Sequence, residues 1–417
     1  MRPSNPKLKS SDGSSSGDRP DRRKQRRAGP PDEEQAPPTA STPAPIPLRV
    51  VVPFEDSLLD QDALKVVRRL TRHGYEAYFV GGGVRDLLLG CRPKDFDIAT
   101  DARPEQVRAL FRNSRVIGRR FRLAHVIFGD GKLIEVATFR RTPESLADDS
   151  EGNAPEELLI RSDNAFGEAH EDAKRRDLTI NGLFYDVDRR EVIDYVGGFV
   201  DVQARLVRTI GDPEVRFRED PVRMLRSIKF AARLDLGIDP EVYDAIVGCR
   251  EEIIRSAKAR LLEELLKVLR CGSTRKAFWL LWETGLLHVL VPELATHLDD
   301  DAARGDDAGH VWRMLAGIDQ LTIARDRPLD DLTLLTVMLL DPMREAAEGE
   351  VDQVAAAMDF AEDFFRRFTV PRRLADGMSR TIAALPRVAS GRPGRFARSD
   401  LFRIASEVAS IDREACR

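Results

Sequence analysis

The chain has 417 residues, of which 42% are hydrophobic and 33% charged, and its formal net charge is −4. Such a length allows about two to four domains with sizeable cores. The slightly acidic balance excludes a uniformly basic nucleic-acid-binding protein. The net charge does not exclude a local basic groove, because only the charge near the phosphates governs binding of a nucleic acid.

No apolar run approaches the ~20 residues that a membrane helix needs, and the N-terminus lacks the apolar stretch of a signal peptide. We therefore expect a cytoplasmic protein that does not associate with membranes. The four cysteines are scattered and form no C-x-x-C pair. This pattern argues against a zinc site or a disulfide framework and suits a reducing compartment.

Residues 1–48 are rich in Ser, Pro, Gly and Arg and show no periodic apolar pattern. This composition predicts a disordered tail, because it offers too little apolar surface to offset the entropy of ordering. The tail contains a basic cluster from Arg22 to Arg27. Such a run favours a solvated surface, with a contact to RNA as the alternative.

The first folded stretch combines a helix, a strand and a glycine turn. Apolar residues fall at helical spacing from Asp60 to His73, and the apolar run from Ala77 to Val80 then predicts a strand. The strand ends in three glycines that include Gly81 and Gly82, and a short helical segment with Arg85 follows. A glycine turn of this kind lets backbone N–H groups approach phosphates.

Two acidic residues, Asp95 and Asp97, follow this turn. On one strand their side chains would point to the same face, because strand side chains alternate with period two. Separately, an Asp-x-Asp pair or a Gly-Gly pair more often marks a plain surface turn. Their order on a strand–turn–helix–strand scaffold instead favours a metal-dependent site for a nucleoside triphosphate.

A predicted hairpin supplies a third acid. After a predicted helix from Pro104 to Phe111, apolar runs from Ala124 to Phe128 and from Lys132 to Phe139 flank the sequence Gly-Asp-Gly. The second strand places Glu135 among apolar residues, where a charge is seldom buried unless it is paired or binds a metal. We favour a third metal-site carboxylate over a solvated position on an edge strand.

Residues 143–162 are polar and acidic, which predicts a mobile loop. The stretch from Glu171 to Asp186 then begins as a helix. It gathers groups that bind phosphates and hydroxyls within a short space, namely Arg175, Arg176, Asp177 and Asn181.

From Ile210 onward the pattern becomes persistently helical. A helix is predicted from Glu219 to Arg233, with Pro221 near its start. Asp220, Arg223 and Arg226 recur at three-residue intervals, so they share one flank of that helix. On spacing alone, an ordinary salt-bridged surface helix is the favoured interpretation.

The remaining chain is also predicted to be helical. Amphipathic helices are expected at Arg260–Leu269, Lys276–Leu287 and Asp330–Leu340, with an acidic linker at Asp299–Asp307 and an Arg-rich helical stretch at Val351–Cys416. The expected fold class is therefore α+β, with a mixed α/β head followed by an all-helical region. We expect the head at residues 54–200, a helical neck at 201–270, and a body and tail at 271–417.

Three motifs together carry a family resemblance. G-G-G-V-R-D-L-L-L-G with D-F-D, then R-R-D-L-T-I-N, then E-D-P-V-R-M-L-R, resemble the second class of the DNA polymerase β nucleotidyltransferase superfamily. That class holds bacterial poly(A) polymerases and CCA-adding tRNA nucleotidyltransferases. The flanking stretches favour the bacterial poly(A) polymerases, and they are Ile117–His125, Ile134–Phe139, Asp163–Gly167, Val370–Arg373 and Gly391–Arg403.

The resemblance implies a polymerase β-like head and a role for each motif. Asp95 and Asp97 would hold two Mg²⁺ ions, with Glu135 as a plausible third acid, and Asp177 would belong to the active site. One ion would activate the 3′-hydroxyl of the RNA, and the other would stabilise the departing pyrophosphate. The implied nucleotide-binding residues are Gly81, Gly82, Arg85, Arg176, Asn181, Asp220, Arg223 and Arg226.

The resemblance also implies a reaction and its partners. Template-independent addition of AMP from ATP to RNA 3′ ends, which promotes RNA turnover, is the leading hypothesis. We expect no DNA substrate. The helical body and tail would bind RNA, and proteins of RNA decay are possible partners. A CCA- or A-adding tRNA nucleotidyltransferase shares every catalytic motif and is the alternative. An inactive RNA-binding module is disfavoured, because the paired acids, Arg85 and the second motif are intact.

Overall fold

The computed structural model describes residues 45–118, 122–142, 165–305, 309–325, 329–392 and 394–416. These residues belong to one compact unit that extends from Pro45 to Arg417. The N-terminal tail up to residue 44, with its basic cluster, and the loop at residues 143–162 lie outside the described residues. The disorder and mobility expected there stay predictions.

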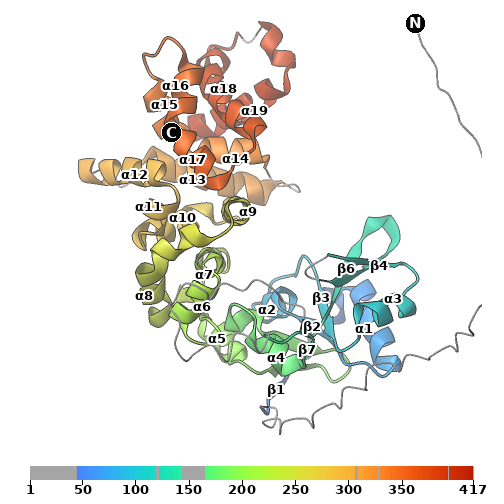
Figure 1. Cartoon of the computed structure of the whole chain (residues 1–417). Coiled ribbons are helices and arrows are strands. Elements are labelled where there is room, and N and C mark those ends of the chain that lie inside the picture. Colours follow the sequence, from blue (N-terminus) through green and yellow to red (C-terminus); the bar gives the residue numbers. More distant parts are fainter. Residues whose placement is uncertain are drawn as a thin grey trace, which may run out of the picture. The chain divides into compact units, whose positions relative to one another are not determined.

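The head is built on one eight-stranded sheet with the strand order β1-β8-β7-β2-β3-β6-β5-β4 (Figure 1). Neighbouring strands are antiparallel except for β3 and β6, which run parallel. The strands are β1 (Leu48–Val51), β2 (Ala77–Val80), β3 (Asp97–Thr100), β4 (Ser114–Ile117), β5 (Leu123–Ile127), β6 (Leu133–Thr138), β7 (Leu183–Asp186) and β8 (Glu191–Asp194).

Strand β1 lies before residue 54, where the head was expected to start, and its first residue was assigned to the tail. Leu48 pairs with Asp194 of β8, and Arg49 donates a hydrogen bond to Glu191 at 3.3 Å. Leu48 and Val51 are exposed on this edge strand. An edge strand with exposed apolar residues and an arginine carries too weak an alternating pattern to stand out from a polar tail.

Helices cover both faces of the sheet. The larger core lies under α1 (Gln61–Arg72), α2 (Gly82–Leu88), α3 (Pro104–Leu110) and α5 (Gly198–Ala204). A smaller cluster, with Val80, Phe139 and Phe184, lies under α4 (Ala169–Lys174) on the opposite face. Helix α1 starts where Asp60 accepts hydrogen bonds from the backbone amides of Asp62 and Ala63, as its capping position predicts.

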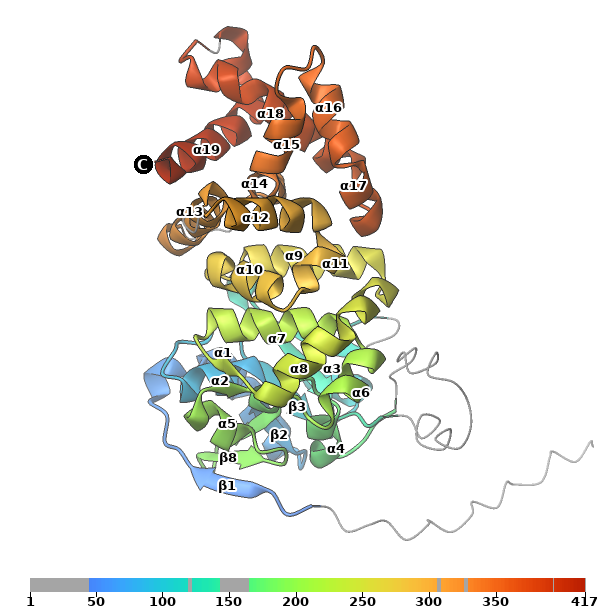
Figure 2. The ribbon, with the colours of Figure 1, turned by 90° about the vertical axis from the view of Figure 1, so that its left-hand side faces the viewer.

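The rest of the chain is helical apart from a two-stranded pair, β9 (Leu206–Val207) and β10 (Gly237–Ile238). The first helices are α6 (Pro213–Glu219), α7 (Val222–Arg233), α8 (Pro240–Cys249), α9 (Lys258–Leu269), α10 (Thr274–Glu283) and α11 (Leu286–Leu290). They are followed by α12 (Pro292–Arg304), α13 (His310–Ala324), α14 (Asp331–Met338), α15 (Leu340–Ala347), α16 (Gln353–Phe360), α17 (Glu362–Phe368), α18 (Arg372–Ala389) and α19 (Asp400–Ala415). Figure 2 shows these helices in successive layers from α7 onward.

Helix α7 contributes to two apolar cores. Leu225 and Ile228 belong to the helical core, which runs on to Ala415 in α19. Phe230 and Ala231 belong to the core of the head. Helix α7 therefore packs on both sides, and this fixes the side chains on its remaining face. Among the described helices, none combines the length and the apolar character that crossing a membrane requires.

Two details of the helical region differ from the predictions. The helix expected at Lys276–Leu287 is broken, because Gly285 adopts a φ of +72° between α10 and α11. The acidic linker expected at Asp299–Asp307 is wrong for its first part, since Asp299 to Arg304 complete α12. The apolar residues of α12 come before this acidic run, and no helical apolar pattern marks its last turns.

Candidate functional site

The site is built around the glycine turn at the end of β2. Gly81 has a φ of +67°, and a Cβ atom there would lie 2.9 Å from Arg176 Nη1. A Cβ atom at Gly83 would lie 3.2 Å from the carbonyl oxygen of Asp95. Glycine is needed at these points, because Arg176 and the segment that carries Asp95 pass directly against the backbone of the turn.

The two acids of the first motif do not share a strand. Strand β3 starts at Asp97, which pairs with Val80 of β2, whereas Asp95 lies in the preceding loop. The prediction that both carboxylates project from one strand is therefore wrong, because the chain joins the sheet only at Asp97. The two carboxylates remain close enough that the charge of Asp95 raises the pKa of Asp97.

Asp97 holds a poorly compensated negative charge. Burial and the charge of Glu135 raise the pKa of Asp97 to about 6, the charge of Asp95 adds to the rise, and only Arg176 opposes it. The residue is nevertheless exposed to solvent at the start of β3, so its carboxylate is open to ligands. Glu135 comes close because β3 and β6 run parallel, with Ile98 beside Val136.

Glu135 lies on an interior strand, since β6 pairs with both β3 and β5. The edge-strand alternative is therefore excluded, but the side chain is 51% exposed. Its Oε1 atom lies 3.3 Å from Nε2 of His125, the residue opposite it on β5. Glu135 is thus half-solvated and paired with a histidine, and its role as a third metal ligand stays a prediction.

Tight clustering of metal-ligand side chains occurs elsewhere in the described part of the chain. His310, Asp412 and Cys416 bring ligand atoms within 4.8 Å of one another, whereas Asp95, Asp97 and Glu135 form no group so tight. Both ring nitrogens of His310 are already paired, with Asp341 at 2.6 Å and Asp412 at 3.1 Å. These pairs join α13 to α15 and α19, so the helical cluster is a set of ion pairs between helices.

The second motif forms a satisfied network around Asp177. The Oδ2 atom accepts a hydrogen bond from Arg226 Nε at 2.6 Å, and Oδ1 accepts from the Leu178 amide at 2.8 Å and from Asn181 Nδ2 at 3.1 Å. Burial alone would raise the pKa of Asp177, but Arg226 and Asn181 lower it to about 2. Asp177 is therefore held as a carboxylate that anchors Arg226.

Two arginines of the motifs are also held in place. Arg85 is buried, donates to Asp86 at 2.6 and 2.9 Å and to Asn181, and lies 4.7 Å from the centre of the Phe230 ring. Arg176 donates to Asp172 at 2.9 and 3.2 Å and to the carbonyl oxygen of Asn181 at 3.1 Å. Asn181 thus links both guanidinium groups, which fixes their positions beside the glycine turn.

The third motif is not one exposed helical flank. Asp220 lies between α6 and α7, and its two carboxylate oxygens accept hydrogen bonds from Arg260 of α9 at 2.8 Å each. Arg223 is buried and donates to Glu219 at 3.0 Å, while Arg226 reaches Asp177. The surface-helix interpretation is wrong, because α7 packs against the head and turns these side chains inward.

These side chains converge on one cavity of about 410 Å³. Its lining includes every predicted site residue except Asp95 and Glu135, and arginines outnumber aspartates by six to three. The lining residues are Gly81, Gly82, Arg85, Asp97, Arg176, Asp177, Asn181, Asp220, Arg223, Arg226, Phe230, Arg233 and Arg260. Strands and helices far apart in the sequence thus build one basic cavity with an acidic edge.

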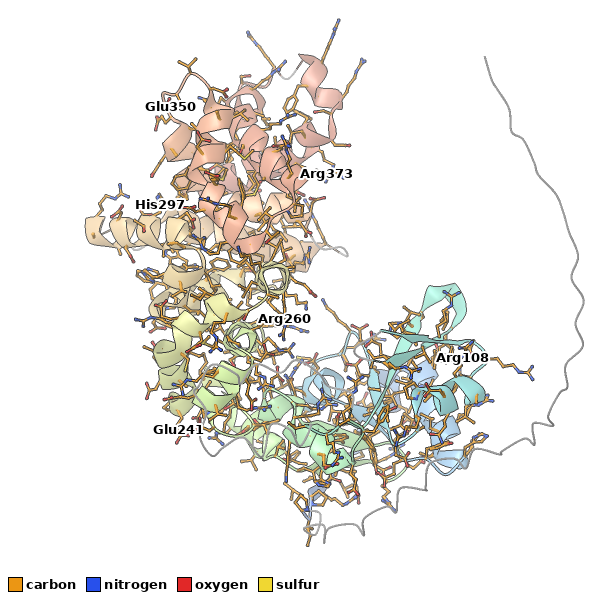
Figure 3. All side chains as sticks on the ribbon, viewed as in Figure 1. Arg108, Glu241, Arg260, His297, Glu350 and Arg373 are labelled. Atoms are coloured by element: carbon orange, nitrogen blue, oxygen red, sulfur yellow. The ribbon has the colours of Figure 1, made fainter. Side chains whose placement is uncertain are left out.

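Three lining residues were missed by sequence reasoning. Phe230 and Arg233 continue the cavity-facing side of α7 beyond Arg226, so helical spacing gave a signal for them. Arg260, labelled in Figure 3, comes from α9 and reaches Asp220 across 40 positions of sequence. No local pattern marks Arg260, because only the packing of α9 beside α7 brings it to the cavity.

Comparison with known proteins relates the chain to a family. The Poly A polymerase head domain matches residues 77–208, and the family described as the probable RNA and SrmB-binding site of polymerase A matches residues 235–298. Poly(A) polymerase I of Salmonella typhimurium is 42% identical over 352 residues, which cover 81% of this chain and 74% of that protein. The chain belongs to the poly(A) polymerase family.

CCA-adding enzymes are more distant relatives of this poly(A) polymerase family member. The enzyme of Geobacillus thermodenitrificans is 36% identical over 261 residues, covering 61% of this chain and 60% of that protein. The crystal structure of the Bacillus stearothermophilus CCA-adding enzyme in complex with CTP is 28% identical, with a TM-score of 0.59, and covers 85% of this chain and 77% of that one. The predicted family resemblance and the predicted α+β fold class are confirmed.

Proposed function

We propose that this chain is a template-independent polynucleotide adenylyltransferase, which transfers AMP from ATP to the 3′ end of RNA and releases pyrophosphate. The observation that carries the proposal is the cavity, where six arginines gather around the glycine turn beside Asp97. This charge balance suits a triphosphate, whose oxygens accept charge-assisted hydrogen bonds from guanidinium groups. The relative named Poly(A) polymerase I supports adenylate as the transferred group.

The glycine turn and the arginines bind the triphosphate. Gly81 and Gly82 line the cavity with bare backbone, so phosphate oxygens can approach the N–H groups there. Arg176 lies against Gly81, and its hydrogen bonds to Asp172 hold it in that position. Arg85 adds a buried positive charge whose orientation Asp86 fixes. Binding therefore costs little reorganisation of these side chains.

The acidic edge of the cavity fits Mg²⁺. Asp95 and Asp97 offer hard carboxylate oxygens, and a raised pKa of Asp97, caused by burial and by the charges of Glu135 and Asp95, supports a cation there. Asp95 and Asp97 would hold the ions, with Glu135 as the third acid. When bound, Mg²⁺ supplies charge neutralisation at the triphosphate and a lower pKa for the 3′-hydroxyl of the RNA.

The base is selected by protein side chains, since no template strand is involved. Asp220, Arg223 and Arg226 place one carboxylate and two guanidinium groups on the cavity wall. Asp177 holds Arg226 through Nε, and the terminal nitrogens of that guanidinium, which make no hydrogen bond to the described residues, can face a base edge. Phe230 adds an apolar surface beside them. Together they discriminate between nucleotides through donors, acceptors and shape.

Tails added in this way would expose RNA to turnover in the cytoplasm, with RNA-decay proteins as partners. These parts of the proposal rest on the family alone. The competing function is addition of CCA to tRNA, which the shared fold of a CCA-adding enzyme bound to CTP favours. The higher identity and coverage of the poly(A) polymerase relative favour adenylate tails instead.

An extension assay tests the proposal. Purified chain with Mg²⁺ receives each nucleoside triphosphate separately, on a generic RNA primer and on tRNA that lacks its 3′ CCA. We expect long tails on the generic primer from ATP and little product from CTP. Addition of CCA to tRNA, with no extension of the generic primer, would overturn the proposal and establish the competing function.

A further inference from the structure

Helix α10 carries an exposed tryptophan, Trp279, outside the catalytic cavity. Its residue surface is 47% exposed, although large aromatic residues normally lie inside. The ring rests on two further tryptophans, with its centre 5.5 Å from that of Trp282 and 5.4 Å from that of Trp312. All three tryptophans of the chain therefore meet at this one point.

The tryptophan cluster is held rigidly. Trp282 Nε1 donates a hydrogen bond to Asp299 of α12 at 2.8 Å, and Trp312 of α13 is buried. The neighbouring rings of Trp282 and Trp312 thus hold the Trp279 ring in place, while about half of the residue surface stays open to solvent. A partly exposed ring that its neighbours hold in place is preorganised for stacking, because little side-chain entropy is lost on binding.

A basic cavity of about 380 Å³ adjoins this ring. Arg275 lines it and precedes Trp279 by four residues, so both side chains lie on the same face of α10. Among the described residues, no acidic side chain pairs with the Arg275 guanidinium. The acid in the cavity, Asp319, is already used, because it accepts hydrogen bonds from the backbone amides of Thr274 and Arg275 at 2.5 and 3.1 Å.

The cavity beside Trp279 and the catalytic cavity both have lining residues near the end of α7. Helix α10 packs directly on α7, and Lys276 pairs at 2.5 Å with Asp235, just beyond the end of α7. Arg233, near that same end, lines the catalytic cavity. The two cavities therefore lie against the same helix, near its C-terminal end.

We propose that Trp279 stacks on a base of the RNA strand upstream of its 3′ end, while Arg275 pairs with a neighbouring phosphate. This inference rests on the proposed function, since it requires an RNA substrate. Stacking on an aromatic ring beside a free cation is how single-stranded nucleic acid is bound without sequence preference. The site lies within the segment 235–298, whose matching family is described as a probable RNA and SrmB-binding site. A protein ligand is the competing occupant, but Arg275, which has no acidic partner in the described part of the chain, favours a phosphate.

Binding of oligoadenylate of about 16 nucleotides to the full chain tests the site. We expect Trp279→Ala to raise the Kd about 5- to 100-fold, the range that one stacked base contributes. Trp279→Phe should keep part of the affinity, because it retains a ring, and it guards against misfolding as the cause. Arg275→Gln should reduce the slope of log Kd against log salt concentration by about one.

Intrinsic fluorescence gives a second readout. Oligoadenylate should quench the wild-type signal, and Trp279→Phe should lose most of that quenching although Trp282 and Trp312 remain. The matched control is Arg304→Gln, which removes another arginine whose side chain is 62% exposed and should leave the salt slope unchanged. Unchanged Kd and unchanged quenching in the Trp279 variants would overturn the inference.

The two proposals fail in different ways. If wild-type chain makes tails but the Trp279 variants bind RNA normally, the stacking site is refuted and the proposed function stands. If wild-type chain adds no AMP to any RNA, yet binds oligoadenylate through Trp279, the proposed function is refuted and the RNA site stands.

Discussion

Asp97 and Asp177 line the same cavity but lie in opposite electrostatic surroundings. Around Asp177, Arg226 and Asn181 bind the carboxylate and lower its pKa to about 2. Around Asp97, burial, Glu135 and Asp95 raise the pKa to about 6. Carboxylates whose pKa is strongly raised by neighbouring like charges are enriched at functional sites. We therefore propose the Asp97 side as the place for a cation, whereas the hydrogen bonds of Asp177 fix its own position in the cavity wall.

The same contrast separates the arginines of the cavity. Arg85 and Arg176 are held by Asp86 and Asp172, so their charges are partly neutralised and their positions fixed. Arg233 lies 3.6 Å from Asp86, where Arg85 already binds. The cavity as a whole therefore keeps a positive excess on one side and a negative edge on the other. A triphosphate that carries Mg²⁺ would complement both sides at once.

The strongest test of the contrast between Asp97 and Asp177 is to remove the charge of Asp97. We expect Asp97→Asn to lower the rate of AMP incorporation by about 10³-fold or more, because the cation loses a ligand. The melting temperature should stay constant or rise, since a repulsion among carboxylates is removed. Incorporation of labelled ATP and thermal unfolding measure the two effects, and Asp95→Asn should behave in the same direction.

Asp188→Asn is the matched control, because Asp188 is exposed beyond the end of β7 and does not line the cavity. It should leave incorporation within about twofold of wild type, as surface changes usually do. Near-normal activity of Asp97→Asn would contradict the assignment of a cation to this edge.

Removing the ion pair between Asp177 and Arg226 should lower stability more than removing the charge of Asp97 does. Arg226→Gln leaves Asp177 buried without its main counter-charge, so we expect the free energy of unfolding to fall by about 2 to 3 kcal/mol. This lies below the ~3 to 5 kcal/mol typical of fully buried pairs, because the Arg226 side chain is 33% exposed. Urea denaturation of Arg226→Gln, Asp177→Asn and the double variant measures the coupling.

The double variant decides this prediction. If the pair acts as a unit, the double variant should lose less stability than the two single losses added together. Strictly additive losses would mean that Asp177 does not depend on Arg226 for its charge.

The sequence allowed most of the scaffold to be predicted. Apolar spacing marked α1, and the apolar run from Ala77 to Val80 marked β2 with the same bounds as in the structure. The family motifs led to the residues that share the cavity. These features depend on local periodicity and on short motifs, and the neighbouring residues of the chain carry that information.

Features that depend on tertiary packing escaped prediction. The position of Asp95 outside the strand depends on where the chain joins the sheet. The pairing of Asp220 with Arg260 depends on how α9 packs beside α7, and the opposite pKa shifts of Asp97 and Asp177 depend on neighbours from other elements. Residue types alone do not distinguish an anchored aspartate from an under-compensated one.

The finest test of the comparison is the pH dependence of stability in the absence of divalent cations. The folded-state pKa of Asp97, about 6, lies above its ordinary value of 3.8, so the folded state binds the proton more tightly. Its contribution to the free energy of unfolding should therefore fall as pH rises from about 4 to 6 and stay constant above that. For Asp177, with a pKa of about 2, the contribution is fully present above pH 3.8 and is lost as pH falls toward 2.

Urea denaturation at a series of pH values, comparing wild type with Asp97→Asn and with Asp177→Asn, should give difference curves confined to these two separate windows. If both difference curves changed in the same pH window, the two carboxylates would share one environment, contrary to the prediction. Addition of Mg²⁺ should stabilise wild type above pH 6 but leave Asp97→Asn nearly unaffected.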